Sequence, residues 1–274
     1  MRLVADSGST KTDWCLVNDQ SILLRVSTSG MNPYLHTDES LDAIISKELL
    51  TSEINTAQID KVEFYGAGCS EPAQTNRILN TLRKFFSAEI SVDHDLLGAA
   101  KSVCKDQEGI AIILGTGSNS CHYDGEKIVR NVRSLGFVLG DEGSGCYIGK
   151  KLIQDYLNDE LPNSVHQQLE LDFDLSASII FDKVYKQPLP NKYLASFATW
   201  VSENSSHSHL YAIIESSFID FFKQHIIKYD KYQNLPIHVV GSVGFHNRKI
   251  LEKVATTFKY KLGTVIKSPI EGLV

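Results

Sequence analysis

The sequence of 274 residues predicts an α/β protein with two duplicated domains, each a mixed sheet flanked by helices. The first observation is an order of elements that occurs twice: three strands in a meander, then helices that alternate with strands. The second is that each copy opens with an apolar strand and a turn of small residues, "DSGSTKTD" in one and "LGTGSNS" in the other. The third is the length, which favours two hydrophobic cores over one.

The first copy shows its strands as short apolar runs and its helices as apolar residues that recur every three or four positions. Thr37 or Asp38 can cap the first helix, and Pro72 stands near the start of the second. We therefore expect strands over residues 3–5, 14–17, 22–26, 62–68 and 89–95, and helices over residues 36–50, 71–86 and 96–104.

The second copy repeats this order, with the hairpin turn "DG" at Asp124 and Gly125 between its second and third strands. We place the boundary so that residues 1–106 form the N-terminal domain and residues 107–274 the C-terminal domain. After the meander of residues 109–136, we expect helices over 145–158, 174–186, 191–204, 209–230 and 247–258, and strands over 236–242 and 264–266.

Charge and composition restrict the classes of partner. The formal net charge of −6 and the lack of long basic runs argue against nucleic acid or an anionic membrane surface as the partner. The longest apolar run, Ile110–Leu114, is far too short to cross a bilayer, and the N-terminus does not have the pattern of a signal peptide. The 5 cysteines are scattered and form no CxxC pair, which predicts reduced, buried thiols and a cytoplasmic protein.

The two turns of small residues are candidate phosphate-binding sites. Each follows an apolar strand and offers consecutive backbone N–H groups, and glycine lets an anion approach the backbone closely. One such turn alone is more typical of a plain hairpin, but two at matching positions of duplicated halves favour anion binding. "GTGSNS" lacks the third glycine of a dinucleotide-binding fingerprint, and "GSGCYIGKK" does not have the spacing of a Walker A loop.

Five motifs, "LVADSGSTKTDW", "DHDLLGAA", "LGTGSNS", "LGFVLGDEGSG" and "VVGSVG", resemble those of the actin-like sugar kinases in order and spacing. The chain resembles most closely the BadF/BadG/BcrA/BcrD ATPase family, whose best-known soluble members are N-acetylglucosamine kinases. The resemblance implies two RNase H-like domains of the actin-like ATPase type, each with a five-stranded mixed sheet, and a cleft between the domains. It also implies ATP-dependent phosphorylation, with Mg²⁺, of an amino sugar, first of all N-acetylglucosamine at its 6-hydroxyl.

The resemblance assigns a role to each matching residue. Asp6 would hold Mg²⁺ beside the phosphates, and Asp95 would be the general base, with Asp93 as its rival two residues earlier. These roles suit the chemistry, because phosphoryl transfer needs a metal ion, amide donors and a carboxylate that accepts the hydroxyl proton. The first phosphate turn would be Ser9, Thr10 and Lys11, the second Gly115, Thr116 and Gly117, the adenosine contacts Gly241 and Ser242, and the sugar contacts Asn32, Ser118, Asn119 and Asp141.

Several of these residues also have a purely structural interpretation. Asp95 and Asp141 could each cap the helix that follows them, and Asn32, which precedes a proline, could be a turn residue. Glu142 could be a second cap or could form an ion pair. Lys11 could lie on the phosphates or point into solvent.

Two other functions remain open at the level of the sequence. The same family includes activators that couple ATP hydrolysis to electron transfer through an iron–sulfur cluster between two subunits, and Cys104 and Cys121 are the cysteines left for such a role. A non-catalytic sugar sensor on this scaffold is the second alternative. Whether the protein forms a homodimer is also open. In the family a helix follows the last strand, and "SPIEGLV" predicts that Glu271–Val274 starts this helix or packs near the interdomain region. We also expect the chain to be short relative to its family.

Overall fold

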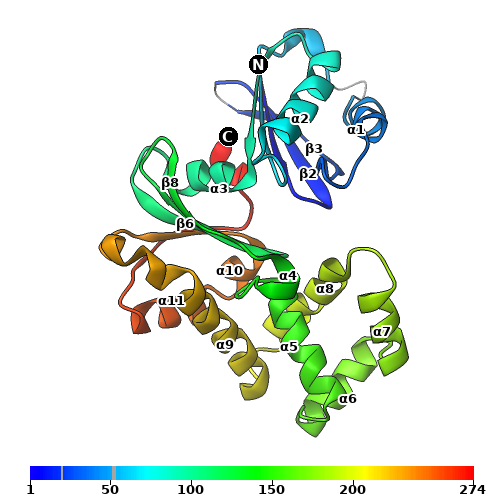
Figure 1. Ribbon diagram of the computed structural model, residues 1–274, viewed down its shortest axis with the longest axis vertical. Helices are drawn as coiled ribbons and strands as arrows, with labels where there is room; N and C mark the ends of the chain where they lie inside the picture. The colour runs from blue at the N-terminus through cyan, green and yellow to red at the C-terminus, as the bar shows by residue number, and fades with distance from the viewer. Residues whose placement is uncertain (20, 51–53) are drawn as a thin grey trace. The chain divides into compact units, whose positions relative to one another are not determined.

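The computed structural model describes residues 1–19, 21–50 and 54–274, which divide into two compact units. Unit 1 consists of Met1–Asp106, Gly125–Ile128 and Ser268–Val274, and unit 2 of Gln107–Asp124 and Val129–Lys267. Each unit contains one five-stranded mixed sheet (Figure 1). No helix in the described part of the chain combines the length and the apolar character that crossing a bilayer requires.

The sheet of unit 1 has the strand order β3-β2-β1-β4-β5. Strands β1, β4 and β5 are parallel to one another, and β2 is antiparallel to both β1 and β3. The carboxyl ends of the three parallel strands therefore share one edge, which we call the carboxyl edge of unit 1. The strands are β1 (Arg2–Ser7), β2 (Lys11–Val17), β3 (Ile22–Ser29), β4 (Lys61–Gly66) and β5 (Glu89–His94).

The two faces of this sheet carry different helices. Leu3 and Ala5 belong to a buried cluster with residues of α1 and α2, whereas Val4 packs with Ile270 of α12 and with Tyr65 on the other face. Because side chains alternate along a strand, Asp6 lies on the same face as Val4. The helices are α1 (Asp38–Ile44), which continues as the π-helix η1 (Ile45–Leu49), the 3₁₀ turn η2 (Thr56–Gln58), α2 (Pro72–Phe85), α3 (Asp95–Cys104) and α12 (Ile270–Leu273).

The sheet of unit 2 repeats this topology with the order β10-β9-β6-β7-β8. Strand β6 occupies the place of β1, with an antiparallel neighbour on one side and a parallel neighbour on the other. The predicted pair of five-stranded mixed sheets is thereby confirmed, and so is the internal duplication. The strands are β6 (Gly109–Leu114), β7 (Ser118–Tyr123), β8 (Ile128–Val132), β9 (Ile237–Val240) and β10 (Leu262–Ile266).

The helices of unit 2 form one apolar core with β6 and β9. Three of them, α4, α6 and α10, were not predicted, because they are short or have a weak apolar pattern. The helices are α4 (Gly136–Leu139), α5 (Gly145–Leu157), α6 (Asn163–Asp172), α7 (Ala177–Tyr185), α8 (Pro190–Glu203), α9 (Ser208–Gln224), α10 (Ser242–His246) and α11 (Arg248–Thr257), with a 3₁₀ segment η3 (Ile226–Tyr232).

The closest helix packing in unit 2 occurs where Gly149 of α5 meets α8. A Cβ at this glycine would collide with the backbone carbonyl of Leu194. Alanine normally stabilises a helix interior by about 1 kcal/mol over glycine. Here we expect the opposite sign, because overpacking against backbone costs roughly 1–3 kcal/mol. Gly149→Ala should therefore lower the melting temperature, and an unchanged or higher one would contradict this packing.

The predicted C-terminal helix is confirmed as α12. Gly272 lies so close to the carbonyl of Ser102 in α3 that a Cβ would collide with it, and Arg2 donates a hydrogen bond of 3.0 Å to the carbonyl of Leu273. Residues 268–274 are therefore held to unit 1 by backbone packing as well as by Ile270.

Candidate active site

Two carboxyl groups lie at the carboxyl edge of unit 1. Asp6 is the penultimate residue of β1 and pairs in register with Tyr65 of β4, while Asp95 directly follows β5. Burial raises the pKa of Asp6 to about 7, and the negative charges of Asp95 and Asp13 add to this effect, which Lys11 opposes. The charge of Asp95 thus destabilises the ionised form of Asp6, an arrangement that favours a bound cation.

Asp95 does not cap α3. The side chain of His94 takes this role, since its Nδ1 accepts a hydrogen bond from the Leu97 amide at 3.2 Å. Asp95 Oδ1 accepts a bond of 2.9 Å from the Leu96 amide, which lowers the pKa, but burial is the larger effect and raises it. The position of Asp95 at the start of a helix favours its ionised form, but burial outweighs this effect. A raised pKa makes the carboxylate a stronger proton acceptor.

The residues around Asp6 fit a hydrated Mg²⁺ ion. Among the described residues there is no cluster of three or more His, Cys, Asp or Glu side chains that could hold a metal ion. Mg²⁺ at a nucleotide keeps several waters and takes phosphate oxygens, so one protein carboxylate is sufficient. Asp6 can supply that carboxylate. Lys11, the cation that acts on Asp6, also forms an ion pair with Asp13 at 2.7 Å, so it does not neutralise Asp6 alone.

The first turn of small residues is closed by a hydrogen bond of 2.9 Å from the Gly8 amide to the Lys11 carbonyl. Gly30 packs directly on it, since a Cβ there would lie 2.5 Å from the Gly8 carbonyl oxygen and 2.6 Å from the Thr10 nitrogen. Ser9 accepts a bond of 2.9 Å from the Asn32 carboxamide. The turn is thus supported from one side by the chain that follows β3.

Asn32 is a turn residue, as one of its interpretations predicted. Its side-chain oxygen accepts a hydrogen bond of 3.0 Å from the Tyr34 amide, while its nitrogen contacts Ser9. The structure therefore brings Asn32 to the first phosphate turn, and its contact with a sugar stays a prediction. Lys11 pairs with Asp13 and remains more than half exposed.

The second turn, Gly115–Gly117, joins β6 to β7 and meets the start of α5. The carbonyls of Gly115 and Thr116 accept bonds of 2.8 and 3.1 Å from the amides of Gly145 and Cys146. Gly241 approaches the same turn at φ +122°, where a Cβ would collide with the Leu114 carbonyl, so that only glycine fits. The structure thus brings together the second turn and the predicted adenosine contacts.

A pocket of about 580 Å³ opens beside this turn within unit 2. Its volume lies in the range of small-molecule sites. Three of the residues predicted to bind the nucleotide line this pocket. The sequence did not predict the wall that α8 contributes, because its alanine, serine and threonine residues give no distinctive pattern. The lining residues are Gly115, Thr116, Gly145, Ala195, Ala198, Thr199, Ser202, Glu203, Ser242, Val243, His246 and Lys267.

The structure also brings Ser118 and Asp141 together. Asp141 is 8% exposed, and its Oδ1 accepts bonds from the Ser134 hydroxyl at 3.2 Å and the Ser118 amide at 3.4 Å. A Cβ on Gly117 would lie 3.0 Å from the other carboxyl oxygen. Within the described part of the chain the buried Ser118 hydroxyl has no hydrogen-bond partner. An orphaned buried hydroxyl beside a buried carboxyl group is what a polar ligand would satisfy.

The remaining alternatives are resolved by their contacts. Ser144, and not Asp141, caps α5, because its hydroxyl accepts a bond of 3.1 Å from the Tyr147 amide. Glu142 lies beside His225, with 3.6 Å between Oε2 and Nε2. The side chain of Asn119, unlike that of Ser118, already has a hydrogen-bond partner: its carboxamide oxygen accepts a bond of 3.0 Å from Asn131. Its contact with a sugar stays a prediction.

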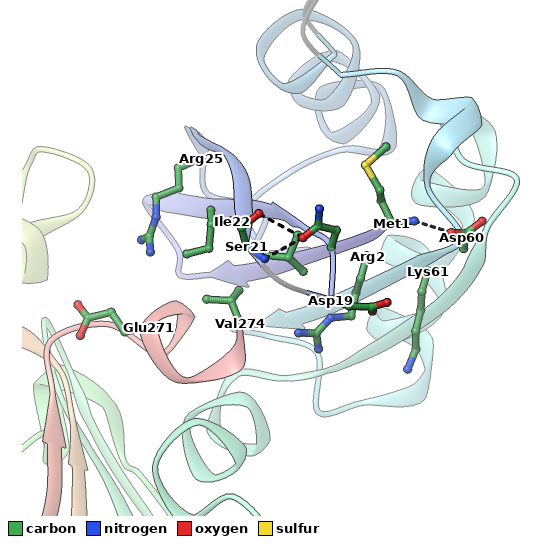
Figure 2. A pocket seen from close by; sticks show the side chains of 12 residues that line it. Met1, Arg2, Asp19, Ser21, Ile22, Arg25, Asp60, Lys61, Glu271 and Val274 are labelled. Carbon is green, nitrogen blue, oxygen red and sulfur yellow. Dashed lines mark hydrogen bonds and ion pairs between the residues drawn. The ribbon is translucent and has the colours of Figure 1, made fainter.

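A larger pocket of about 850 Å³ lies in unit 1, at the edge opposite the carboxyl edge (Figure 2). It contains none of the predicted site residues. Arg2 donates a bond of 2.8 Å to Glu63, and the amino group of Met1 pairs with Asp60. Several of its charged groups are thus already satisfied within the unit.

All 5 cysteines are buried in the fold. Burial raises the pKa of the thiols of Cys69, Cys104 and Cys146 to about 12. A cluster shared between two subunits needs thiolates at the surface. This arrangement disfavours the iron–sulfur alternative.

Comparison with known proteins identifies the family. The profile of the BadF/BadG/BcrA/BcrD ATPase family matches residues 5–217, whereas no curated protein sequence matches the chain. Two solved structures are those of bacterial proteins named putative N-acetylglucosamine kinase. That of Porphyromonas gingivalis is 39% identical, with a TM-score of 0.96 over 100% of this chain and 97% of the other. That of Chromobacterium violaceum is 18% identical, with a TM-score of 0.70 over 99% and 96%.

A ROK family glucokinase from Streptomyces griseus, in complex with glucose and AMPPNP, shares the fold at 13% identity, with a TM-score of 0.52 over 97% of this chain and 94% of the other. The expectation of a chain short for its family is not met by these structures, since it covers nearly all of each. The resemblance seen in the sequence is confirmed, and the chain belongs to the BadF/BadG/BcrA/BcrD ATPase family.

Proposed function

We propose that this protein phosphorylates an amino sugar with ATP, with N-acetylglucosamine as the first candidate and its 6-hydroxyl as the acceptor. The observation that carries the proposal is the pocket of about 580 Å³ that opens on the second phosphate turn. The 39% identity to a protein named as such a kinase supports the substrate class.

The nucleotide is proposed to occupy this pocket. Small side chains of α8 leave room for an adenosine, and Glu203 and Ser202 offer acceptors for ribose hydroxyls. From there the phosphates reach the backbone amides of the second turn and the cation of Lys267, which also lines the pocket. Amides and a cation at this place spread the negative charge of the transferred phosphoryl group.

The chemical step is assigned to unit 1. Asp6 would hold Mg²⁺, which when bound neutralises charge on the phosphates. Asp95 accepts the proton of the sugar hydroxyl as that oxygen attacks the γ-phosphate in line, and the first turn, with Ser9, Thr10 and Lys11, donates N–H groups to phosphate oxygens. The sugar is held by Ser118 and Asp141, with Asn32 and Asn119 as further candidates.

The two competing functions have less support. An iron–sulfur activator requires exposed thiolates, and the cysteines are buried. A sensor without catalysis has no use for two carboxyl groups with raised pKa values at one edge of a sheet, such as those of Asp6 and Asp95.

Filling the pocket tests the nucleotide assignment. Thr199 is exposed and lines the pocket, so Thr199→Trp is tolerated by the fold and occupies the proposed adenosine site. We expect ATP binding, measured by calorimetry, to weaken at least about tenfold, which corresponds to a loss of roughly 1.4 kcal/mol. Ser196→Trp is the matched control, because Ser196 is exposed on the same helix and does not line the pocket. Equal ATP affinity in both variants would place the nucleotide elsewhere.

Asp141→Asn tests the sugar assignment. The variant keeps the size of the side chain and loses its negative charge, and hydrogen bonds to charged groups contribute about 1.5–3 kcal/mol. We expect the KM for the sugar to rise roughly 10-fold or more while the KM for ATP stays the same. A variant whose two KM values rise together would instead indicate a general disturbance of unit 2.

A further inference from the structure

One side of α9 contacts the loop that carries Asp141. Ser217 and Phe221 in α9 and His225 at its C-terminal end recur at four-residue spacing, so they lie on one side of the helix. We call these three residues the α9 face. Ser217 and Phe221 are fully buried and His225 is 4% exposed.

Each residue of the α9 face contacts one of the two residues that follow Asp141. The Ser217 hydroxyl accepts a hydrogen bond of 3.1 Å from the Gly143 amide. Phe221 packs against Gly143, where a Cβ would lie 3.0 Å from the Phe221 Cβ. His225 Nε2 lies 3.6 Å from Glu142 Oε2, and its ring stacks on Phe221 at a centroid distance of 4.9 Å.

The loop needs this support because its backbone is unusual. Asp141 has a φ of +59° and Gly143 a φ of +78°. The left-handed conformation costs roughly 1–2 kcal/mol for a residue with a Cβ, so Asp141 adopts it only when its surroundings enforce it. The carbonyl of Asp141 accepts a hydrogen bond from the Ser144 amide at 3.1 Å. The α9 face contacts Glu142 and Gly143, the residues between Asp141 and Ser144.

We propose that the α9 face positions Asp141 and thereby sets the affinity for the sugar, with Ser217, Phe221 and His225 as positioning residues that do not touch the substrate. The inference rests on the proposed function, in which Asp141 binds the sugar. It gives a role to a part of the chain whose sequence contains no recognisable motif. Burial lowers the pKa of His225 and so favours the neutral form of its ring, an effect that the neighbouring Glu142 opposes.

Ser217→Ala removes the acceptor of the Gly143 amide. Leaving a buried N–H unpaired costs about 1–3 kcal/mol, so we expect the Kd for N-acetylglucosamine, measured by calorimetry, to rise roughly 5- to 100-fold. The Kd for ATP should stay within twofold, and hydrogen exchange at the amides of residues 141–144 should accelerate. Ser216→Ala is the matched control, because the Ser216 hydroxyl donates a hydrogen bond within its own helix, to the Ile213 carbonyl at 3.1 Å.

His225 supplies a second, independent arm. His225→Ala should weaken sugar binding, and His225→Gln should recover part of the affinity, since glutamine can still donate to Glu142. His209→Gln is the control, because His209 lies at the start of the same helix and pairs with Asp155 at 2.8 Å. The control should leave the sugar affinity within twofold of the wild type.

The outcomes separate the inference from the function on which it rests. If the wild type and the α9-face variants bind the sugar equally while Asp141→Asn binds it weakly, the inference is overturned and the function stands. Equal loss of ATP and sugar affinity in Ser217→Ala and His225→Ala also overturns it. A wild type that binds ATP but none of N-acetylglucosamine, glucosamine, N-acetylmannosamine and glucose overturns the proposed function. The α9 face then loses its assigned role as well.

Discussion

Asp95→Asn is expected to lower kcat at least about 100-fold, because loss of a general base typically costs on the order of 100- to 10,000-fold in rate. Asparagine keeps the size and the hydrogen bond to the Leu96 amide but cannot accept the hydroxyl proton. The variant should remain folded and should bind ATP as the wild type does. Steady-state kinetics and thermal melting on the same preparation measure both quantities.

Two matched variants make this result specific. Asp93→Asn changes the rival carboxylate in β5 and should leave most of the turnover, whereas His94→Ala removes the true cap of α3 and should cost roughly 1 kcal/mol of stability. Near-normal turnover in Asp95→Asn, together with a large loss in Asp93→Asn, would transfer the role of the base to Asp93.

Asp6→Asn is expected to lose turnover by a similar factor for a different reason. The carboxylate charge is what holds the hydrated cation beside the phosphates, and asparagine does not supply it. Productive binding of the metal–nucleotide complex should weaken, so that the Mg²⁺ concentration needed for half-maximal activity rises, while the affinity for the free sugar changes little. A sugar affinity that falls as steeply as turnover would place Asp6 outside the metal site.

The same variant has an opposite effect on stability. The pKa of Asp6 is raised in the folded protein to about 7, so the folded state holds this proton more tightly than the unfolded state. Its contribution to the free energy of unfolding is therefore greatest below the ordinary pKa of aspartate and declines as the pH rises toward 7. In metal-free buffer at pH 8, Asp6→Asn should melt at least about 2 °C higher than the wild type, whereas at pH 4 the difference should shrink.

Asp13→Asn is the control for this pH dependence, because Asp13 pairs with Lys11 and is partly exposed. It should not raise the melting temperature at pH 8 as Asp6→Asn does. A destabilised Asp6→Asn at pH 8 would show that the Asp6 carboxylate is stabilising in the absence of a metal ion.

The sheets and the two turns could be predicted from the sequence because their signals are local. β1 and β6 are apolar runs, and each turn of small residues stands where a strand ends. The roles of Asp6, Asp95 and Gly241 came from the resemblance to a family. The fold agrees with them, since the carboxyl ends of parallel strands share an edge and the φ of +122° at Gly241 favours a glycine.

The rest depends on contacts between distant residues. Apart from Glu203, the α8 wall of the pocket consists of alanine, threonine and serine, which are common on any helix. The α9 face places Phe221 against Gly143, a contact that no spacing in the sequence encodes. The direction of the pKa shift of Asp95 depends on burial, whereas a sequence shows only the position at the start of a helix.

Sugar-dependent release of ADP tests the central claim most directly. The purified protein is assayed with ATP and Mg²⁺ against N-acetylglucosamine, glucosamine, N-acetylmannosamine and glucose, with Asp95→Asn as the blank, and the product is identified by phosphorus NMR. We expect ADP release that requires a sugar, the highest kcat/KM for N-acetylglucosamine, and a phosphate on its 6-hydroxyl. ADP release at the same rate with and without every sugar, or none at all from a protein that binds ATP, would contradict the assignment as an amino-sugar kinase.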